Sequence, residues 1–278
     1  MEKKCFIAGV PDAGKTTFIA ALWDIIKRNN GTLELQFTTN PDNTTYLNEI
    51  WEYWMSMKKI ERSKTPAPDD ITINVKRASN GEELVLDIPD FMGEQFQKII
   101  DHTLPDNIVQ WIAQSDRMLY LINVLDDSIK DDLEQQDTAQ EKDEIDRAKE
   151  REDAPRLAPE KMMQASQNMM VLKYIANHAK MKKVAIGLSA WDVKMKEGKT
   201  PEEFLRRRSP MLYNFIKLHF NDCLFFGVSA QGFDYNDKGE KEAEMKDKAR
   251  KCNRAFISIG DEKEMSPDLT KPFNYLIS

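Results

Sequence analysis

Residues 3–22 read KKCFIAGVPDAGKTTFIAAL, and this stretch decides the fold. The apolar run over residues 4–8 predicts a buried strand, and the apolar residues from Phe18 onward predict a helix. Between them, Gly9 to Thr16 match the pattern G-x-x-x-x-G-K-[ST] in the strand, loop and helix context that this pattern requires. The stretch therefore predicts a loop that surrounds the phosphates of a nucleotide.

Each position of this loop has a physical task. Consecutive backbone N–H groups and the positive end of the following helix attract an anion, and Gly14 leaves room for its close approach. Lys15 brings a positive charge to the phosphates and is expected to act in catalysis, while the Thr16 hydroxyl can bind Mg²⁺. The residues predicted to bind the nucleotide here are Gly9, Pro11, Asp12, Ala13, Gly14, Lys15, Thr16 and Thr17.

The rest of the chain alternates short aliphatic runs with helix-length amphipathic segments, which predicts an α/β fold. We expect a P-loop NTPase three-layer sandwich with a mainly parallel sheet. Further strands are predicted near residues 71–76, 83–87, 118–124, 184–188 and 224–228. Asn80-Gly81 between two of these runs is typical of a hairpin, which would make one strand antiparallel.

The framework is predicted to be a single domain over residues 1–278, with two insertions and a C-terminal extension at about 233–278. The insertion at about 40–64 reads as a helix whose aromatic residues pack against its own domain, with a partner surface as the alternative. The insertion at about 126–160 is strongly acidic and reads as a solvated helix or loop rather than a docking site.

Composition excludes several classes of function. The net charge of -7 and the lack of a basic stripe argue against a nucleic-acid partner. No apolar stretch is long enough for a membrane span, and no lipidation motif predicts an anchor. The widely spaced Cys5, Cys223 and Cys252 are typical of reduced thiols, which favours a cytoplasmic location.

Polar residues follow three more predicted strands, where ligands collect in open α/β sheets. Asp87 ends the strand in LVLDIPD, and a carboxylate there can hold Mg²⁺. Ser189, Ala190, Trp191 and Asp192 end a second strand, and Ser229 with Ala230 ends a third. The order of these strand ends matters more than any one of them.

This series resembles the motifs of the P-loop GTPases of the Ras-like and translation-factor class, over residues 5–232. The resemblance implies that Asp87 holds Mg²⁺, that the Asp192 carboxylate accepts from guanine N1–H and the exocyclic amine, and that the Ala230 backbone N–H reaches guanine O6. Ser189 and Ser229, which stand beside these two in the motifs, and Asp90 are also expected to contact the nucleotide. Thr65 falls where a switch threonine of the family closes on Mg²⁺ and the γ-phosphate.

The departures from the family matter as well. Asp90 stands where members usually have the glycine that contacts the γ-phosphate, and Phe91 replaces the residue that orients the attacking water. Intrinsic turnover is therefore expected to be slow. Ser189 and Ala190 replace the usual Asn and Lys, which removes a loop-bracing amide and a lysine stem over the base. Arg62 is a candidate arginine finger, with an ordinary solvated arginine as the alternative.

Through its tail, SPDLTKPFNYLI at residues 266–277, the chain more closely resembles bacterial double-GTPase proteins. We expect a Mg²⁺-dependent protein that binds GTP and GDP, hydrolyses GTP slowly or with a partner's help, and works as a switch through a protein partner. The expected partner is a second GTPase domain or a second copy of the chain. Two alternatives stay open: a P-loop kinase that uses ATP, with RRRSP at residues 206–210 as its arginine lid, and a catalytically idle, nucleotide-stabilised interaction module.

Overall fold

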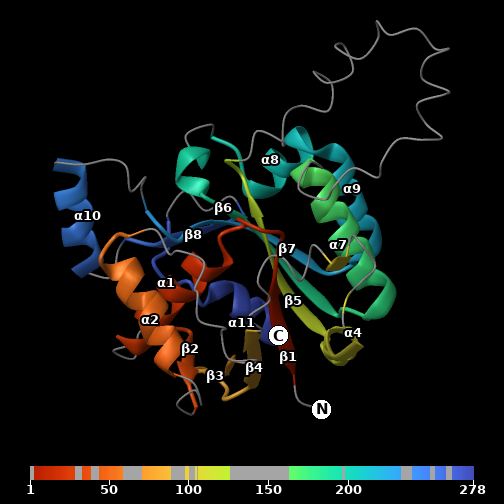
Figure 1. Ribbon diagram of the computed structural model, residues 1–278, viewed down its shortest axis with the longest axis horizontal. Coiled ribbons are helices and arrows are strands. Elements are labelled where there is room, and N and C mark those ends of the chain that lie inside the picture. Colours follow the sequence, from red (N-terminus) through yellow and green to blue (C-terminus); the bar gives the residue numbers. More distant parts are fainter. Residues whose placement is uncertain are drawn as a thin grey trace, which may run out of the picture.

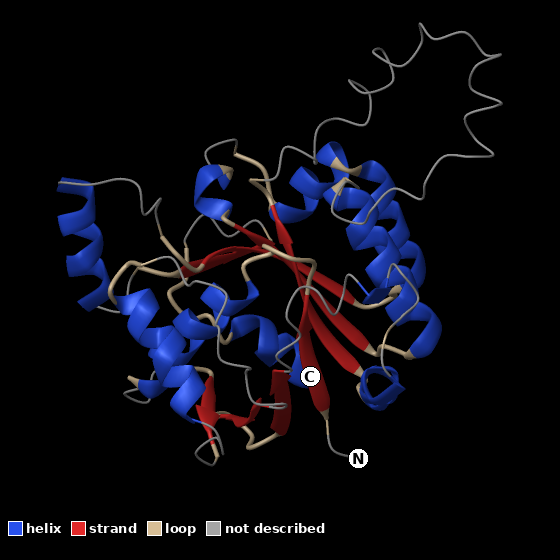
Figure 2. Cartoon of the chain, viewed as in Figure 1, coloured by secondary structure: helices blue, strands red, loops and turns tan. Residues whose placement is uncertain are grey.

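The computed structural model describes residues 3–28, 33–38, 44–58, 71–88, 98–99, 104, 106–125, 163–195, 198–232, 240–250, 254–260 and 265–278 (Figures 1 and 2). The strands are β1 (Lys4–Ala8), β2 (Leu35–Phe37), β3 (Ile71–Arg77), β4 (Glu83–Ile88), β5 (Arg117–Asn123), β6 (Lys183–Ser189), β7 (Cys223–Ser229) and β8 (Phe256–Ile259). The helices are α1 (Lys15–Lys27), α2 (Thr44–Met55), α4 (Asp106–Gln114), α7 (Gln164–His178), α8 (Pro201–Arg208), α9 (Pro210–His219), α10 (Glu240–Arg250) and α11 (Lys271–Ile277), with a short 3₁₀ helix, η3, at Trp191–Val193.

The strands form one sheet in the order β2-β3-β4-β1-β5-β6-β7-β8. The central strands β4, β1, β5, β6 and β7 pair in parallel, as predicted. The prediction of one antiparallel strand was wrong, because β3 and β8 both run against the others and three pairs are antiparallel. The strands missed, β2 and β8, are short and lie at the two edges, where few residues carry a periodic signal.

The hairpin between β3 and β4 is confirmed. Its turn contains Gly81, which has a φ of 74°, and the Gly81 N–H donates to the Arg77 carbonyl at 2.9 Å. The Asn80 side chain accepts from the Glu82 backbone N–H at 3.1 Å. The turn residues thus set the antiparallel register in which Lys76 lies opposite Glu83.

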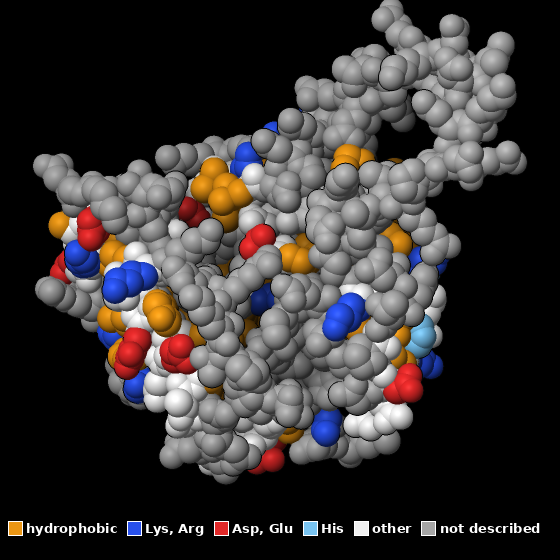
Figure 3. All heavy atoms as spheres, in the orientation of Figure 1, with side chains coloured by type: hydrophobic (Ala, Val, Ile, Leu, Met, Phe, Trp, Pro, Cys, Tyr) orange, Lys and Arg blue, Asp and Glu red, His pale blue; other side chains and the backbone are white. Residues whose placement is uncertain are grey.

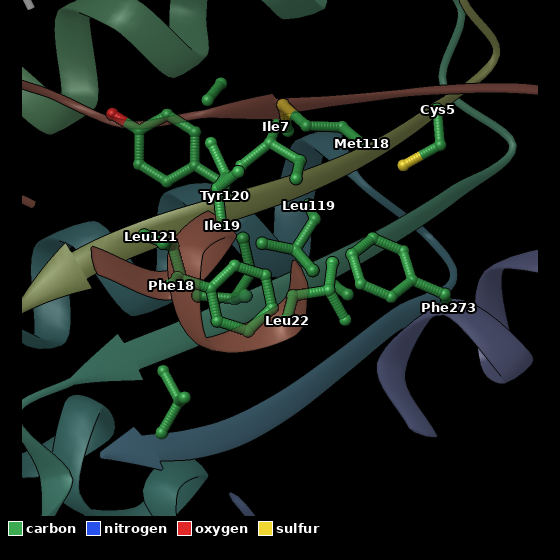
Figure 4. Close-up of a cluster of buried hydrophobic side chains, with 14 of the residues drawn as sticks. Cys5, Ile7, Phe18, Ile19, Leu22, Met118, Leu119, Tyr120, Leu121 and Phe273 are labelled. Atoms are coloured by element: carbon green, nitrogen blue, oxygen red, sulfur yellow. The ribbon is translucent and has the colours of Figure 1, made fainter. Parts of the chain in front are cut away.

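Helices cover both faces of the sheet, which gives three layers (Figure 1). One group contains α1, α2 and α11, and the other contains α4, α7, α8 and α9. Phe18 and Leu22 of α1 gather with Leu119 of β5 and Phe273 of α11 in the core between α1 and the sheet (Figure 4). The Phe18 and Phe273 ring centroids are 6.1 Å apart. The last residues of the chain therefore belong to the main core.

Basic side chains at the amino-terminal ends of the parallel strands donate hydrogen bonds to the C-terminal end of α11. Each of the last four carbonyls of this helix would otherwise lack an intrahelical donor. The donors are Arg77 to Asn274 at 2.6 Å, Arg117 Nε to Leu276 at 2.6 Å, Lys183 to Tyr275 at 3.4 Å, and Lys3 to Ile277. Positive charge at this end also complements the helix dipole.

The insertion predicted at 40–64 contains a helix, α2, which packs on α1 (Figure 1). Its buried side chains are Leu47, Ile50 and Trp54, whereas Tyr53 is 40% exposed. The interpretation that the aromatic residues pack against their own chain is confirmed for Trp54. The acidic insertion predicted at 126–160 lies outside the described residues.

None of the described helices is long and apolar enough to cross a membrane. On the face that Figure 3 shows, the described Lys and Arg side chains lie among Asp and Glu side chains. Cys5 is buried and Cys223 is partly buried, and neither forms a disulfide. Cys252 lies outside the described residues.

Candidate functional site

The loop between β1 and α1 has the backbone that its glycines predict. Gly9 has a φ of 153°, and a Cβ there would lie 2.6 Å from the Leu121 carbonyl oxygen. Gly14, with a φ of 87°, caps α1. Because Gly14 has no side chain to accept from the first-turn N–H groups, those groups stay available to an anion.

Lys15 reaches back across this loop. Its ammonium donates to the Gly9 carbonyl at 2.6 Å and to the Val10 carbonyl at 2.9 Å. The charge is thus held at the mouth of the loop, beside the start of α1. Asp12 has a φ of 59° and Ala13 is fully buried, so the loop turns sharply between the two glycines.

The residues predicted to bind Mg²⁺ are described only in part. Thr16 and Thr17 are partly buried in the first turn of α1. Asp87 lies in β4 opposite Phe6 of β1 and Thr72 of β3, so the backbone brings it beside the strand that leads into the loop. The Asp87 side chain lies outside the description, as do Thr65, Arg62, Asp90 and Phe91.

The second predicted motif lies directly against the phosphate loop. Ser189 is the last residue of β6, and a Cβ added to Gly14 would lie 3.3 Å from both the Cβ and the hydroxyl oxygen of Ser189. Ala190 turns the chain with a φ of 57° and places Asp192 in η3. The phosphate loop and the Ser189–Asp192 motif thus meet at the carboxyl ends of the parallel strands.

Asp192 is held by the third strand end. The Ser229 hydroxyl donates to Asp192 Oδ1 at 2.6 Å, and Ser229 is 1% exposed. This hydrogen bond fixes the carboxylate at the carboxyl ends of β6 and β7, next to Ala230. A carboxylate can accept hydrogen bonds from a planar base while a neighbouring backbone N–H donates one to the same base.

Trp191 anchors the turn that carries Asp192. It is 2% exposed and packs edge-on against Phe204 of α8, with ring centroids 5.5 Å apart. A Cβ at Gly227 of β7 would lie 2.3 Å from the Trp191 ring, so only glycine leaves room for the indole. This packing limits the positions that Asp192 can take.

Asn123 supplies a brace that the sequence interpretation missed. Replacement of the usual asparagine by Ser189 predicted the loss of a loop-bracing amide, yet the Asn123 amide donates to the Asp12 carbonyl at 3.0 Å. Its own side-chain oxygen accepts from the Leu125 N–H at 2.9 Å. The signal available in the sequence was a lone amide side chain that ends an otherwise apolar strand, β5.

The arginines that suggested a kinase lid have a local explanation. Arg206, Arg207 and Arg208 form the last turn of α8, where positive charge complements the helix dipole. The Arg208 guanidinium also lies 6.0 Å from the centre of the Phe204 ring. Their position is accounted for by the end of this helix.

Comparison with protein families shows which family contains the chain. The model of the family described as Double-GTPase 1 matches residues 6–276. The chain belongs to the Double-GTPase 1 family. The match includes the phosphate loop, Asp192 and α11, so the predicted resemblance to double-GTPase proteins is confirmed and the chain is a GTPase-domain protein.

Two solved structures are similar to this Double-GTPase 1 chain at low identity. One is the signal recognition particle receptor SRb-GTP/SRX complex from Chaetomium thermophilum, which is 11% identical over 84% of this chain and 93% of that chain, with a TM-score of 0.38. The other is the S. cerevisiae Ski7 GTPase-like domain bound to GDP and inorganic phosphate, which is 13% identical over 86% of this chain and 46% of that chain, with a TM-score of 0.36. Among curated proteins, none matches this chain in sequence.

Proposed function

We propose that this Double-GTPase 1 protein binds GTP and GDP with Mg²⁺, hydrolyses GTP slowly, and uses the bound nucleotide to control contact with a protein partner. The observation that carries the proposal is the bond from Ser229 to Asp192, held against a loop built for phosphates. A carboxylate fixed at the carboxyl ends of β6 and β7 suits the N1–H and amino groups of guanine, which adenine does not offer in the same pattern.

The chain's own residues would do the following. The loop amides and Lys15 hold the β- and γ-phosphates and oppose the negative charge that develops on them during in-line attack by water. Thr16 and Asp87, with Thr65, are the residues that would hold Mg²⁺, which supplies further charge neutralisation when bound. The loop fits this, because Gly14 begins α1 without a side chain that could accept from the first-turn N–H groups.

Slow turnover follows from position 91. A phenylalanine there offers no group that can orient the attacking water, so most of the rate must come from charge stabilisation alone. A partner that supplies an arginine or a glutamine would raise it. The partner expected from the family is a second GTPase domain or a second copy of this chain.

Two measurements on the purified protein test the proposal. Calorimetric titration with Mg²⁺ present should show binding of GTP and GDP with at least about tenfold preference over ATP. Phosphate release from GTP should be slow in the unaltered protein and absent in Lys15→Ala. Preference for ATP would favour the kinase alternative, whereas tight GTP binding without any phosphate release would favour an idle interaction module.

The switch is tested by assembly. Light scattering on the protein loaded with a non-hydrolysable GTP analogue and on the protein loaded with GDP should give different molar masses if a second copy is the partner. A monomer mass in both states would remove the homodimer and leave a second GTPase domain as the expected partner, whereas a dimer mass in both states would contradict control of the homodimer by the nucleotide.

A further inference from the structure

The loop at the end of β7 is held by a hydrogen bond and packing contacts from residues in other parts of the chain. Here residues 229–232 are called the purine loop. The Trp54 indole N–H donates to the Ala230 carbonyl at 2.8 Å, and these side chains are 2% and 8% exposed. Trp54 comes from α2, the helix inserted between α1 and β3. A tryptophan in the insertion therefore touches the residue whose backbone N–H is expected to meet the base.

Arg254 in turn packs against Trp54. Its guanidinium lies 3.6 Å from the centre of the Trp54 ring, and its Nη2 donates to the Trp54 backbone carbonyl at 2.7 Å. Arg254 is 2% exposed, and a Cβ at Gly232 would lie 2.6 Å from the Arg254 carbonyl oxygen. Burial strengthens an interaction between a cation and an aromatic ring. Ala230 and Gly232 of the purine loop thus pack against this buried pair.

The same helix is fastened to α1. The Trp51 indole N–H donates to Asp24 Oδ1 at 2.7 Å, and Arg28 pairs with that carboxylate at 2.8 Å. Trp23 donates to the Asn48 side chain at 3.1 Å. Because α1 begins at the phosphate loop, α2 connects the helix behind the phosphates with the loop beside the base.

We propose that Trp54 and Arg254 are positioning residues for purine recognition: they hold Ala230 so that its backbone N–H faces the carbonyl at position 6 of the base. This inference rests on the proposed function. Ser189 and Ala190 provide no lysine stem over the base, so discrimination depends on Asp192 and Ala230. Asp192 has its own brace in Ser229, and Trp54 with Arg254 is the corresponding brace for Ala230.

Base analogues separate the two braces. Inosine triphosphate keeps the oxygen at position 6 and lacks the amino group, so the preference for GTP over ITP reports on Asp192. 6-Thioguanosine triphosphate keeps the amino group and N1–H and replaces the oxygen by sulfur, a weaker acceptor, so the preference for GTP over this analogue reports on Ala230.

Trp54→Phe is the first variant, because it keeps an aromatic ring under Arg254 and removes the indole donor together with part of the ring system. We expect GTP affinity to fall roughly tenfold. The preference for GTP over 6-thioguanosine triphosphate should fall by at least about threefold, and the preference for GTP over ITP should stay at its original value. Arg254→Met, which keeps an apolar stem, should act in the same direction.

Trp51→Phe is the matched control. It makes the same change on the same helix, but the donor it removes serves Asp24 and not the purine loop. It should leave both preferences unchanged. In the unaltered protein, the indole N–H resonance of Trp54 should shift when GDP is added while that of Trp51 stays in place, which tests the contact without any substitution.

Unchanged preferences in Trp54→Phe and Arg254→Met, or a Trp54 resonance that does not respond to bound GDP, would overturn this inference alone. So would an equal loss in Trp51→Phe. Failure of the unaltered protein to bind any guanine nucleotide would instead overturn the proposed function, and this inference with it.

Discussion

The Ser229 hydroxyl donates to the Asp192 carboxylate at 2.6 Å, across the ends of the adjacent parallel strands β7 and β6. The sequence of either strand by itself does not show that these two residues are partners. The pairing of β6 with β7 brings Ser189 opposite Val228 and so sets the two strand ends side by side. The purine-side geometry is therefore a product of sheet register.

Removal of this hydrogen bond should weaken guanine binding selectively. In Ser229→Ala, the Asp192 carboxylate loses a buried donor, and we expect GTP affinity to fall about ten- to a hundredfold because a bond to a charged group is lost. Affinity for ATP should hardly change. Calorimetry with both nucleotides checks this, and Ser209→Ala, which removes a serine that is 2% exposed outside the site, is the control.

Gly9→Ala should damage the phosphate loop. The new methyl group would lie 2.6 Å from the Leu121 carbonyl at a φ of 153°, and backbone strain of this kind costs about 1–3 kcal/mol. We expect at least about tenfold weaker binding of GTP. Gly81→Ala is the control, because Gly81 also has a positive φ but has nothing within 4 Å of its added Cβ. Equal loss of binding in both variants would contradict the role given to the loop.

Arg117→Leu should destabilise the fold through α11. Arg117 is 6% exposed and its Nε donates to the Leu276 carbonyl, which would be left buried without this donor. The free energy of unfolding in urea should fall by about 2–3 kcal/mol. Lys182→Met removes an exposed cation beside Asp116 and should change it by less than about 0.5 kcal/mol. A similar effect in both would show that Arg117 acts only as a surface charge.

The Cys223 thiol should be unreactive while the protein is folded. Because burial raises its pKa to about 12, the folded protein contains much less thiolate at pH 8 than the unfolded chain does. Alkylation of Cys223 by iodoacetamide, followed by mass spectrometry, should be on the order of a thousandfold slower in the native protein than in guanidinium chloride.

The same shift has a consequence for stability. Because the folded pKa is raised, the contribution of Cys223 is complete below the unfolded pKa of about 8.5 and is lost as the pH rises toward about 12. Cys223→Ser, which stays neutral over this range, should lose less stability between pH 8.5 and 10 than the unaltered protein. An equal loss would contradict this assignment.

Local signals in the sequence were enough for the elements that build the site. The strand, glycine loop and helix over residues 4–27, the Asn80-Gly81 turn and the strand ends at Ser189 and Ser229 all depend on residues close in the chain. Such patterns report backbone conformation and burial directly. The fold class followed from their order.

Contacts between distant segments could not be predicted in this way. The Asn123 brace depends on the register of β5 beside β1, and the contact of Trp54 with Ala230 joins residues 176 positions apart. The basic side chains that donate to the last carbonyls of α11 come from widely separated segments of the chain. Each of these residues taken alone looks like an ordinary surface or core side chain, and only the folded chain shows what it holds.

Replacement of the Asp192 carboxylate by an amide tests the central claim, that Asp192 chooses the base, most directly. Asp192→Asn presents an amide that can donate to the carbonyl at position 2 of xanthine, so this variant should lose GTP affinity and gain affinity for xanthosine triphosphate, with phosphate release from the new substrate still dependent on Lys15. A variant that keeps the nucleotide preference of the unaltered protein would show that Asp192 does not choose the base, and would contradict the account.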